Sequence, residues 1–366
     1  MYPARNYCTY FDSGYYSRGL CLIESLKKYS KDCQIWALCL DDKAYLSLSE
    51  QNLNNVFPVS ISEFEEFFPE LVQVKPTRSK VEYYFTLTPF LPQFVLDKDS
   101  GVEMVTYLDS DLYFYSSPEP LFSEIGNASI AVIPHNCKDT SRIKNHGKFN
   151  VGWNTFRRDE TGLACLKRWR QQCIEWCYDY SENNKYADQK YLDEWPDLYR
   201  DVCIIKNSGA NVAPWNIYRF PLSMKGTTLF AGDYPLIFFH FAHLKKVSRQ
   251  TFKANLRFYE IPMGRLLRNK IYYPYLKGLL RIDEAFMPNQ KACDLRNHIR
   301  PPILPVRYKQ MLSSWFSGKS LQKNDDSANN SFLKAVLDLF KFILSTAIDI
   351  YNFDFIYLKN SLKVKT

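Results

Sequence analysis

The chain has 366 residues, a length that allows one large α/β domain with additions or two domains. Hydrophobic residues make up 46 % and charged residues 23 %, which excludes a disordered, collagenous or low-complexity protein. The net charge of +8 is uneven, because the stretch from Lys245 to Lys309 holds fifteen Lys or Arg against four Asp or Glu. This stretch favours an anionic surface or ligand, and without a zinc-finger, helix-turn-helix or RNP pattern we do not expect nucleic acid as the partner.

Up to about residue 250, apolar strand-like runs alternate with helical patterns. Strands are expected at Asn6–Phe11, Gln34–Leu40, Val56–Ile61, Val102–Leu108, Ser129–Ile133, Phe149–Phe156, Val202–Ile205 and Leu236–Phe239. Helices are expected at Tyr15–Tyr29, after Asp41, over Lys80–Leu96 and from about Asp159 to Tyr180. This order predicts an α/β fold with a mainly parallel sheet flanked by helices, in which ligands bind beyond the carboxyl ends of the strands.

The last third of the sequence has a different pattern. A domain at 1–255 is expected to be followed by a helical basic extension at 256–315 and a polar linker at 316–331. Within 332–366, polar residues recur every three or four positions from Phe332 to Tyr357, which predicts an amphipathic helix that lies on a surface and does not span a membrane. Packing on the body, packing on a second subunit and peripheral docking on a membrane are all open for this helix.

The cysteines and the amino terminus bear on the cellular compartment. Met1–Cys8 shows no charged-then-apolar secretion signal, so we expect a cytoplasmic protein, on the cytosolic face of a membrane if the last helix docks there. Its ten cysteines are then expected to be reduced and mostly buried, since no Cys/His set has zinc spacing.

The sharpest chemical signal is a pair of carboxylates after a predicted strand. Asp109 and Asp111 flank Ser110, and both can reach one divalent cation if the backbone turns there. Downstream, His240 and His243 follow another apolar run, where a neutral imidazole can supply a third metal ligand. Each signal alone is weak, because Asp-rich turns are common and a single histidine is more often a core or surface residue.

In their order along the chain, the motifs of residues 5–250 resemble those of family 8 glycosyltransferases, the group that includes glycogenin and the bacterial lipopolysaccharide galactosyl- and glucosyltransferases. Tyr16–Gly19 is similar to the YxxG that opens the first helix, Asp109–Asp111 to the DxD, and Phe149–Gly152 to the FNxG strand. Asp188-Gln189 matches the DQ pair, Trp215-Asn216 the WN, and His240 with Lys246 the HxxGxxK.

The resemblance implies a GT-A type, Rossmann-like fold and a metal-dependent hexosyltransferase. The sugar would pass from a nucleoside-diphosphate sugar, UDP-hexose in the first instance, to a saccharide or lipid-linked saccharide acceptor, with retention at the anomeric carbon. Asp109, Asp111 and His240 would hold Mn²⁺ or Mg²⁺, and Asn150, Asp188 and Gln189 would serve the reacting sugar. Contacts to the nucleotide sugar are expected from Thr9, Tyr10, Asp12, Tyr16, Lys80, Asp109, Ser110, Gly152, Trp215, Asn216, His243, Lys245 and Lys246.

The last motif departs from the family pattern. His243 stands where the family has glycine, Lys245 precedes the expected Lys246, and Val247-Ser248 replaces the usual Pro-Trp. These differences leave the phosphate contact open between two lysines.

Two other functions are compatible with parts of the pattern. A haloacid dehalogenase-type phosphatase also uses DxD after a strand, but its first Asp is a nucleophile on the earliest strand, whereas here the motif lies past residue 100. A non-catalytic nucleotide- or sugar-binding module would show neither metal dependence nor hydrolysis of a sugar nucleotide.

Overall fold

The computed structural model describes residues 4–30, 32–248, 251–286 and 355–357, and the chain divides into two compact units. The first unit comprises Met1–Ala242 and Asn269–Pro288, and the second His243–Arg268 and Asn289–Thr366. The predicted linker at 316–331, residues 287–315 of the predicted basic extension and nearly all of the predicted amphipathic helix lie outside the described residues.

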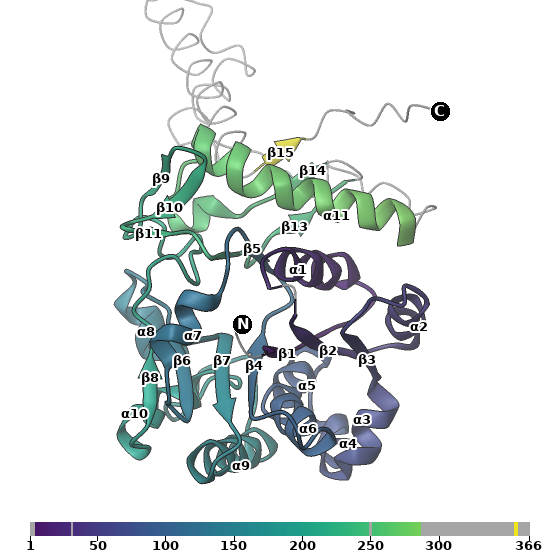
Figure 1. The fold of residues 1–366 in the computed structure, drawn as a ribbon. Coiled ribbons are helices and arrows are strands. Elements are labelled where there is room, and N and C mark those ends of the chain that lie inside the picture. Colours follow the sequence, from purple (N-terminus) through teal and green to yellow (C-terminus); the bar gives the residue numbers. More distant parts are fainter. Residues whose placement is uncertain (1–3, 31, 249–250, 287–354, 358–366) are drawn as a thin grey trace, which may run out of the picture. The chain divides into compact units, whose positions relative to one another are not determined.

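A seven-stranded sheet lies at the centre of the first unit, in the order β3-β2-β1-β4-β7-β6-β8 (Figure 1). Only β7 runs antiparallel to its neighbours, and the other pairs of this sheet are parallel. The prediction of a mainly parallel sheet flanked by helices is therefore confirmed. Its strands are β1 (Asn6–Phe11), β2 (Gln34–Cys39), β3 (Val56–Ser60), β4 (Met104–Leu108), β6 (Ile130–Pro134), β7 (Phe149–Arg157) and β8 (Val202–Ile204).

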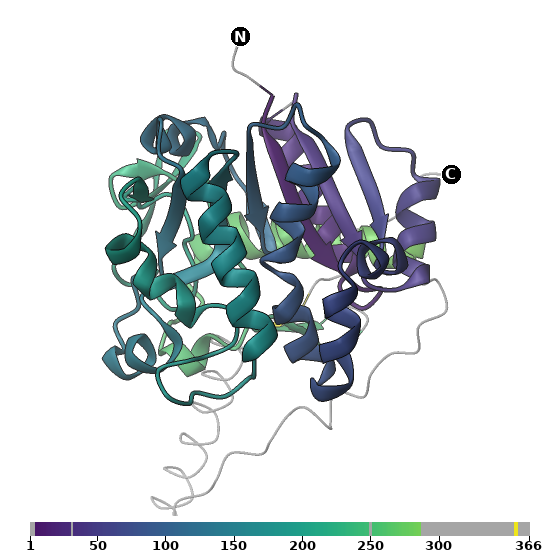
Figure 2. The same cartoon turned by 90° about the horizontal axis from the view of Figure 1, so that it is seen from below.

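Helices cover both faces of this sheet. α1 packs on β1 from one side, whereas α6 and α9 pack on β4 and β7 from the other (Figures 1 and 2). α11, from late in the sequence, packs on α1. The helices are α1 (Tyr16–Tyr29), α2 (Asp42–Glu50), α3 (Ile61–Phe67), α4 (Pro69–Val74), α5 (Lys80–Leu87), α6 (Phe90–Lys98), α7 (Glu119–Ile125), α8 (Thr140–His146), α9 (Glu160–Glu175), α10 (Trp195–Leu198) and α11 (Tyr273–Phe286).

Side-chain caps fix where several helices begin. The Asp41 carboxylate accepts a hydrogen bond from the Ala44 N–H at 2.8 Å, and Asp159 does the same for Gly162. Ser79 caps α5 in a capping box with Glu82. Each cap satisfies a backbone donor that has no partner within its helix.

Three predicted helices differ from the structure. The helix expected over Lys80–Leu96 is two helices, because the proline at 89 lacks the N–H that a continuous helix needs. The helix expected to reach Tyr180 ends at Glu175, and a loop follows. At Phe355–Tyr357 the helix prediction is wrong, since these residues form strand β15.

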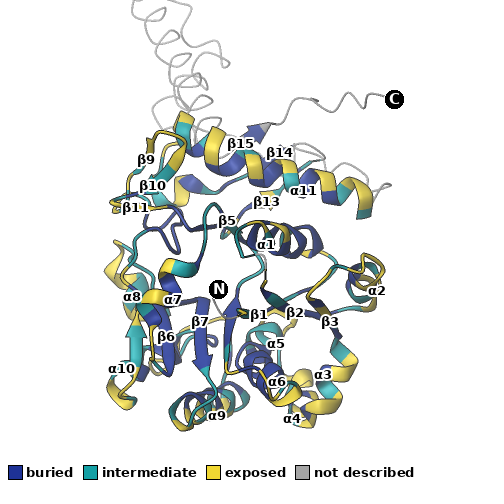
Figure 3. Cartoon of the chain, viewed as in Figure 1, coloured by how far each residue is buried: buried dark blue, intermediate teal, exposed yellow. Residues whose placement is uncertain are grey.

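Aromatic side chains fill much of the core beneath the sheet. Phe64, Phe68 and Phe94 form edge-to-face or tilted pairs, with Phe64 5.3 Å from each of the other two rings. Trp169 packs edge-on against Trp195 at 5.1 Å. The central strands and these helix faces are buried (Figure 3), so most of the aromatic content serves packing.

The remaining strands form small sheets. In the first unit, β5 (Leu112–Phe114) pairs with β12 (Phe238–His240), and β9 (Leu222–Lys225), β10 (Thr228–Ala231) and β11 (Tyr234–Pro235) form a second sheet. In the second unit, β13 (Lys245–Lys246) and β15 flank β14 (Thr251–Lys253). Each cysteine in the described part of the chain is free. In that same part, no helix combines the length and the apolar character needed to cross a membrane.

Candidate active site

The reversed direction of β7 decides which residues meet at one edge of the sheet. Asp109 follows the carboxyl end of β4, and His135 follows that of β6. Because β7 runs the other way, its amino end with Asn150 lies at the same edge, where Asn150 pairs with Ile133 of β6. Residues far apart in the sequence therefore share the edge at which α/β sheets bind ligands.

Asp109, Asp111 and His240 form what we call the carboxylate cluster. A turn closed by the hydrogen bond from the Leu112 N–H to the Asp109 carbonyl separates β4 from β5. β5 then pairs with β12 so that Leu112 lies opposite His240, and the Phe241 N–H donates to the Asp111 carbonyl at 3.0 Å. This pairing brings the imidazole to the two carboxylates.

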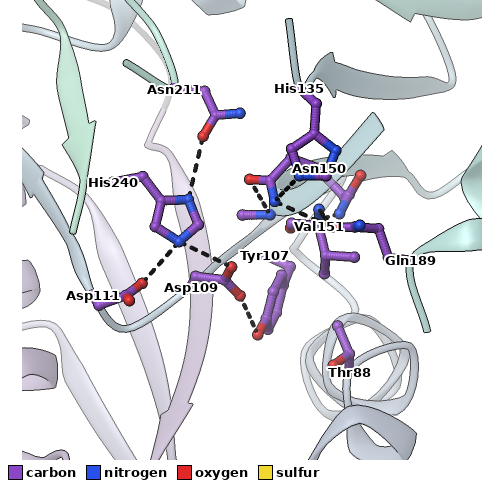
Figure 4. Close-up of polar contacts among 12 residues, drawn as sticks. Thr88, Tyr107, Asp109, Asp111, His135, Asn150, Val151, Gln189, Asn211 and His240 are labelled. Carbon is purple, nitrogen blue, oxygen red and sulfur yellow. Dashed lines mark hydrogen bonds and ion pairs between the residues drawn. The ribbon is translucent and has the colours of Figure 1, made fainter. Parts of the chain in front are cut away.

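The geometry of this cluster suits a divalent cation. His240 Nε2 lies 3.0 Å from Asp111 Oδ1 and 3.7 Å from Asp109 Oδ2 (Figure 4). One ligand atom from each of the three residues lies within 4.8 Å of the other two. Carboxylate oxygens with one imidazole nitrogen fit Mn²⁺ or Mg²⁺ and leave coordination positions open. The three predicted ligands are therefore brought together.

Two residues, Asn211 and Gly152, position the His240 ring on the side of Nδ1. Its Nδ1 lies 3.3 Å from Asn211 Oδ1, which fixes Nδ1 as the protonated nitrogen and turns Nε2 toward the carboxylates. A Cβ added at Gly152 would lie 3.0 Å from His240 Nδ1, so glycine there allows the ring to pack on β7. Gly152 was predicted from its motif, but Asn211 was not, because no local pattern distinguishes it.

Charge within the carboxylate cluster is coupled. Burial raises the pKa of Asp109, which His240 opposes and Asp111 reinforces. Burial also acts to raise the pKa of Asp111, but His240 and Arg18 outweigh it and the pKa is lowered. The pKa of His240 is raised, because the two carboxylates outweigh the effect of its burial. Arg18 was not predicted, although it lies inside the YxxG motif.

His135, Asn150 and Gln189 form a second, neutral group that we call the amide cluster. Asn150 Nδ2 donates to Gln189 Oε1 at 3.2 Å and lies 3.4 Å from His135 Nε2 (Figure 4). Gln189 Nε2 donates to the His146 carbonyl at 2.7 Å. Burial lowers the pKa of His135 to about 4, so its imidazole is neutral at pH 7. The structure brings the predicted Asn150 and Gln189 together and adds His135, which the motif comparison missed.

Asp188 directly precedes Gln189 of the amide cluster, and its charge interacts with that of Asp109 in the carboxylate cluster. It is 4 % exposed, and burial raises its pKa to about 7, while a hydrogen bond with Thr88 opposes the rise and Asp109 adds to it. The Thr88 hydroxyl is 3.1 Å from the Tyr10 hydroxyl. Tyr107, whose ring centroid is 5.8 Å from that of Tyr10, donates to Asp109 Oδ1 at 3.0 Å. A chain of hydroxyl groups thus lies between the buried carboxyl group of Asp188 and the partly exposed carboxylate of Asp109.

Trp215 and Asn216 hold the clusters in place. The Trp215 ring is 5.0 Å from the His240 ring and 5.4 Å from the His135 ring, edge-on to both. Asn216 Nδ2 donates to the carbonyls of His135 at 3.1 Å and of Asn211 at 2.9 Å. The buried Asn216 side chain is therefore used by the backbone of this region.

The residues near β1 that were predicted to contact the nucleotide sugar differ in their exposure and in their contacts. Lys80 Nζ pairs with Asp12 Oδ2 at 2.8 Å, and the Tyr84 hydroxyl donates to the same oxygen at 3.2 Å. Tyr16 is 1 % exposed and stacks on Phe286 at 4.1 Å, which gives it a packing position. The neighbouring Thr9 is buried within β1, and Ser110 is half-buried between the two aspartates.

The last motif is divided between the two units, since His240 belongs to the first unit whereas His243, Lys245 and Lys246 belong to the second. Lys245 and Lys246 form β13 and pair with Lys253 and Phe252. His243 has φ of +61°, in the left-handed region that favours glycine. A histidine side chain therefore occupies a backbone conformation that favours glycine.

Comparison with known proteins identifies relatives. No family model matches the sequence. YfnD of Bacillus subtilis (strain 168) is 33 % identical over 270 residues, which cover 72 % of this chain and 85 % of YfnD. YfnF of the same organism is 33 % identical over 253 residues, which cover 66 % of this chain and 82 % of YfnF. The chain belongs to the YfnD/YfnF family. Both relatives are described as uncharacterized, so membership assigns no reaction.

Several solved glycosyltransferases are similar in structure. The galactosyltransferase LgtC, in complex with donor and acceptor sugar analogues, is 14 % identical with a TM-score of 0.45 and covers 83 % of this chain and 99 % of its own. Mouse xyloside xylosyltransferase 1 is 11 % identical with a TM-score of 0.43 and covers 66 % and 98 %. GlyE of Streptococcus pneumoniae TIGR4 is 15 % identical with a TM-score of 0.45 and covers 78 % and 64 %. These low values assign neither donor nor acceptor to this chain.

Proposed function

We propose that this chain is a metal-dependent glycosyltransferase that uses a nucleoside-diphosphate sugar. The observation that carries the proposal is the carboxylate cluster, in which ligand atoms of Asp109, Asp111 and His240 lie within 4.8 Å of one another beside the amide cluster. A divalent cation held there would neutralise the negative charge of a diphosphate leaving group. Neutral side chains cannot do this.

The protein's own part is to hold the cluster in one geometry. Tyr107 occupies Oδ1 of Asp109 and leaves Oδ2 toward His240. Asn211 fixes the tautomer of His240. Fixed ligands avoid the cost of reorganising them when charge develops on the leaving group.

The amide cluster and Asp188 are proposed to serve the transferred sugar. Asn150 and Gln189 present amide groups, which both donate and accept hydrogen bonds and so match sugar hydroxyls. Asp188 adds a carboxyl group whose pKa of about 7 lets it act in either protonation state. The identity of the sugar as a hexose of UDP, and retention at its anomeric carbon, come from the family 8 resemblance and are part of the proposal.

The nucleotide is proposed to lie toward β1. Tyr10 and Asp12 are partly exposed there, and Lys80, which pairs with Asp12, is exposed. We also propose phosphate contacts from His243, Lys245 and Lys246, for which the motif is the only support.

The acceptor is proposed to be a saccharide or a lipid-linked saccharide. A lipid-linked acceptor would place the basic stretch and the 332–366 segment at a membrane surface.

A substrate screen tests this function. The full chain is incubated with UDP-, GDP- and CMP-sugars, with Mn²⁺, with Mg²⁺ or with excess chelator, and release of the nucleotide is measured. We expect slow hydrolysis of one nucleotide class that depends on the metal. Hydrolysis that is unaffected by chelator, no hydrolysis of any donor, or turnover of p-nitrophenyl phosphate alone would contradict the proposal, and the last result would indicate a phosphatase.

A further inference from the structure

The loop between α9 and Asp188 carries three aromatic side chains that we call the aromatic platform. The rings of Tyr178 and Tyr180 are stacked with centroids 5.5 Å apart. Trp176 lies edge-on to both, at 5.3 Å from Tyr178 and 5.6 Å from Tyr180. Tyr180 is 50 % exposed, so this group presents ring surface to solvent, unlike the core aromatics.

The loop is held by polar contacts on both sides of the platform. The Ala187 N–H donates to the Tyr178 carbonyl at 3.0 Å. The Asp179 N–H donates to Glu82 Oε1 at 3.1 Å, which ties the loop to α5. Rings that are already fixed lose little conformational entropy when a ligand binds to them.

The platform lies next to the residues proposed to serve the sugar. Tyr178 is hydrogen-bonded through its carbonyl to the N–H of Ala187, and Ala187 directly precedes Asp188. Asp188 also contributes to the raised pKa of Tyr186, after burial and Asp179, so the carboxylate is close to this loop. The loop that carries the platform therefore lies beside Asp188 of the proposed reacting centre.

Charged groups border the platform. The Arg78 guanidinium lies 4.1 Å from the centroid of Tyr178, and Lys185 Nζ lies 6.0 Å from that of Trp176. The exposed Asp179 lies between two platform residues in the sequence. The exposed ring of Tyr180 is a flat apolar surface with Trp176 edge-on beside it. With donors and an acceptor at its border, it matches a pyranose, which has an apolar C–H face and polar hydroxyls at its rim.

We propose that the aromatic platform binds the saccharide acceptor by stacking it on Tyr180, with Trp176 edge-on beside the bound sugar ring. The choice of a saccharide rests on the proposed function, whereas the site rests on the exposed, fixed rings beside Asp188. The competing explanation is that the rings only stabilise the loop. That explanation requires no ligand and predicts no preference for a flat ring at position 180.

Saturation-transfer NMR on the full chain tests the site without any turnover. The probes are free lactose, maltose, cellobiose and N,N′-diacetylchitobiose. The variants are Tyr180→Ala and Tyr180→Phe, with Tyr234→Ala as a matched control, because Tyr234 is a similarly exposed tyrosine at 47 % on β11. We expect at least one disaccharide to bind the wild type, the control and Tyr180→Phe, and affinity for it to fall about tenfold or more in Tyr180→Ala.

Once a donor is known, the ratio of transfer to donor hydrolysis gives a second measurement. It should fall in Tyr180→Ala and recover in Tyr180→Phe. Failure of all the disaccharides to bind, or equal binding by Tyr180→Ala and Tyr234→Ala, overturns the inference. If no donor is hydrolysed but disaccharide binding still depends on the ring at 180, the proposed function fails and the saccharide site stands.

Discussion

The two clusters at the carboxyl edge of the sheet differ in how far contacts within the protein satisfy their hydrogen-bonding groups and balance their charges. The amide cluster is closed, since Asn150 donates to Gln189, and Gln189 donates to a backbone carbonyl. The carboxylate cluster places two acids around one imidazole, so with both acids ionised it has an excess of negative charge even when His240 is protonated. The first arrangement is ready to form hydrogen bonds, whereas the second leaves ligand atoms that could hold a cation.

This difference separates the consequences of substitutions. Removing a member of the carboxylate cluster should abolish binding of the cation and everything that depends on it. Removing a member of the amide cluster should leave the cation in place and affect the transferred group. The predictions below use this separation, in order of the expected size of the effect.

Asp111→Ala should produce the largest loss. It removes a ligand atom 3.0 Å from His240 Nε2, so we expect Mn²⁺ binding to be lost and donor hydrolysis to fall about 1,000-fold. Calorimetry with Mn²⁺ and the hydrolysis assay measure the two effects. Asp233→Ala makes the same chemical change at an exposed position between β10 and β11 and serves as the control. Binding of Mn²⁺ by Asp111→Ala with wild-type affinity would contradict the assignment of the cation site.

Asp188→Asn should change stability in a pH-dependent way. A carboxyl group with a pKa of 3.8 when unfolded and about 7 in the native state destabilises the native state as pH rises from 4 to 7. The effect reaches on the order of 4 kcal/mol above pH 7. We therefore expect the variant, which cannot ionise, to melt at a temperature close to that of the wild type at pH 4 and increasingly above it up to pH 7. Thermal melts in chelator check this, and a difference that does not vary with pH would show that Asp188 is ionised in the native protein.

The sequence predicted the strands and the motif residues better than the contacts that support them. β1, β2 and β4 are mainly apolar runs, and the expected and observed bounds agree within two residues. Asp109 and Asp111 are adjacent in the sequence to a strand end, so their position follows from the strand. Such features are local and need no knowledge of the fold.

The supporting contacts depend on pairings between distant segments. His240 reaches Asp111 because β12 pairs with β5, and Asn211 reaches His240 through a contact 29 residues away in sequence. The reversed direction of β7, which brings Asn150 to the site, is equally invisible in an apolar run. For this reason the sequence did not predict His135, Asn211 or Arg18, which is a variable position of the YxxG motif, whereas it did predict the residues that define the motifs.

Gln189→Ala tests the amide cluster, the second of the two clusters compared above. We expect the rate of donor turnover to fall roughly 10- to 100-fold, because interactions with the reacting sugar are lost. Affinity for Mn²⁺ and for the nucleoside diphosphate should stay within about threefold of the wild type, since the carboxylate cluster is intact. Calorimetry with the nucleotide and Mn²⁺ separates these quantities. A parallel fall in nucleotide affinity and rate would show that Gln189 serves the nucleotide and that the two clusters act as one.

Gly152→Ala should give the smallest effect, because it displaces a ligand without removing it. The new methyl group would lie 3.0 Å from His240 Nδ1 and 2.7 Å from Asn150 Oδ1, so both side chains have to shift by a few tenths of an ångström. We expect Mn²⁺ affinity to fall about tenfold, the size typical of a change in the residues that orient a ligand. Gly264→Ala is the control, because its added methyl group has no neighbour within 4 Å in the described part of the chain. Since Gly152 contacts one residue of each cluster, the same variant should also lower turnover at saturating Mn²⁺. If affinity and turnover both match those of the control, the close packing of His240 on β7 contributes nothing to the cation site.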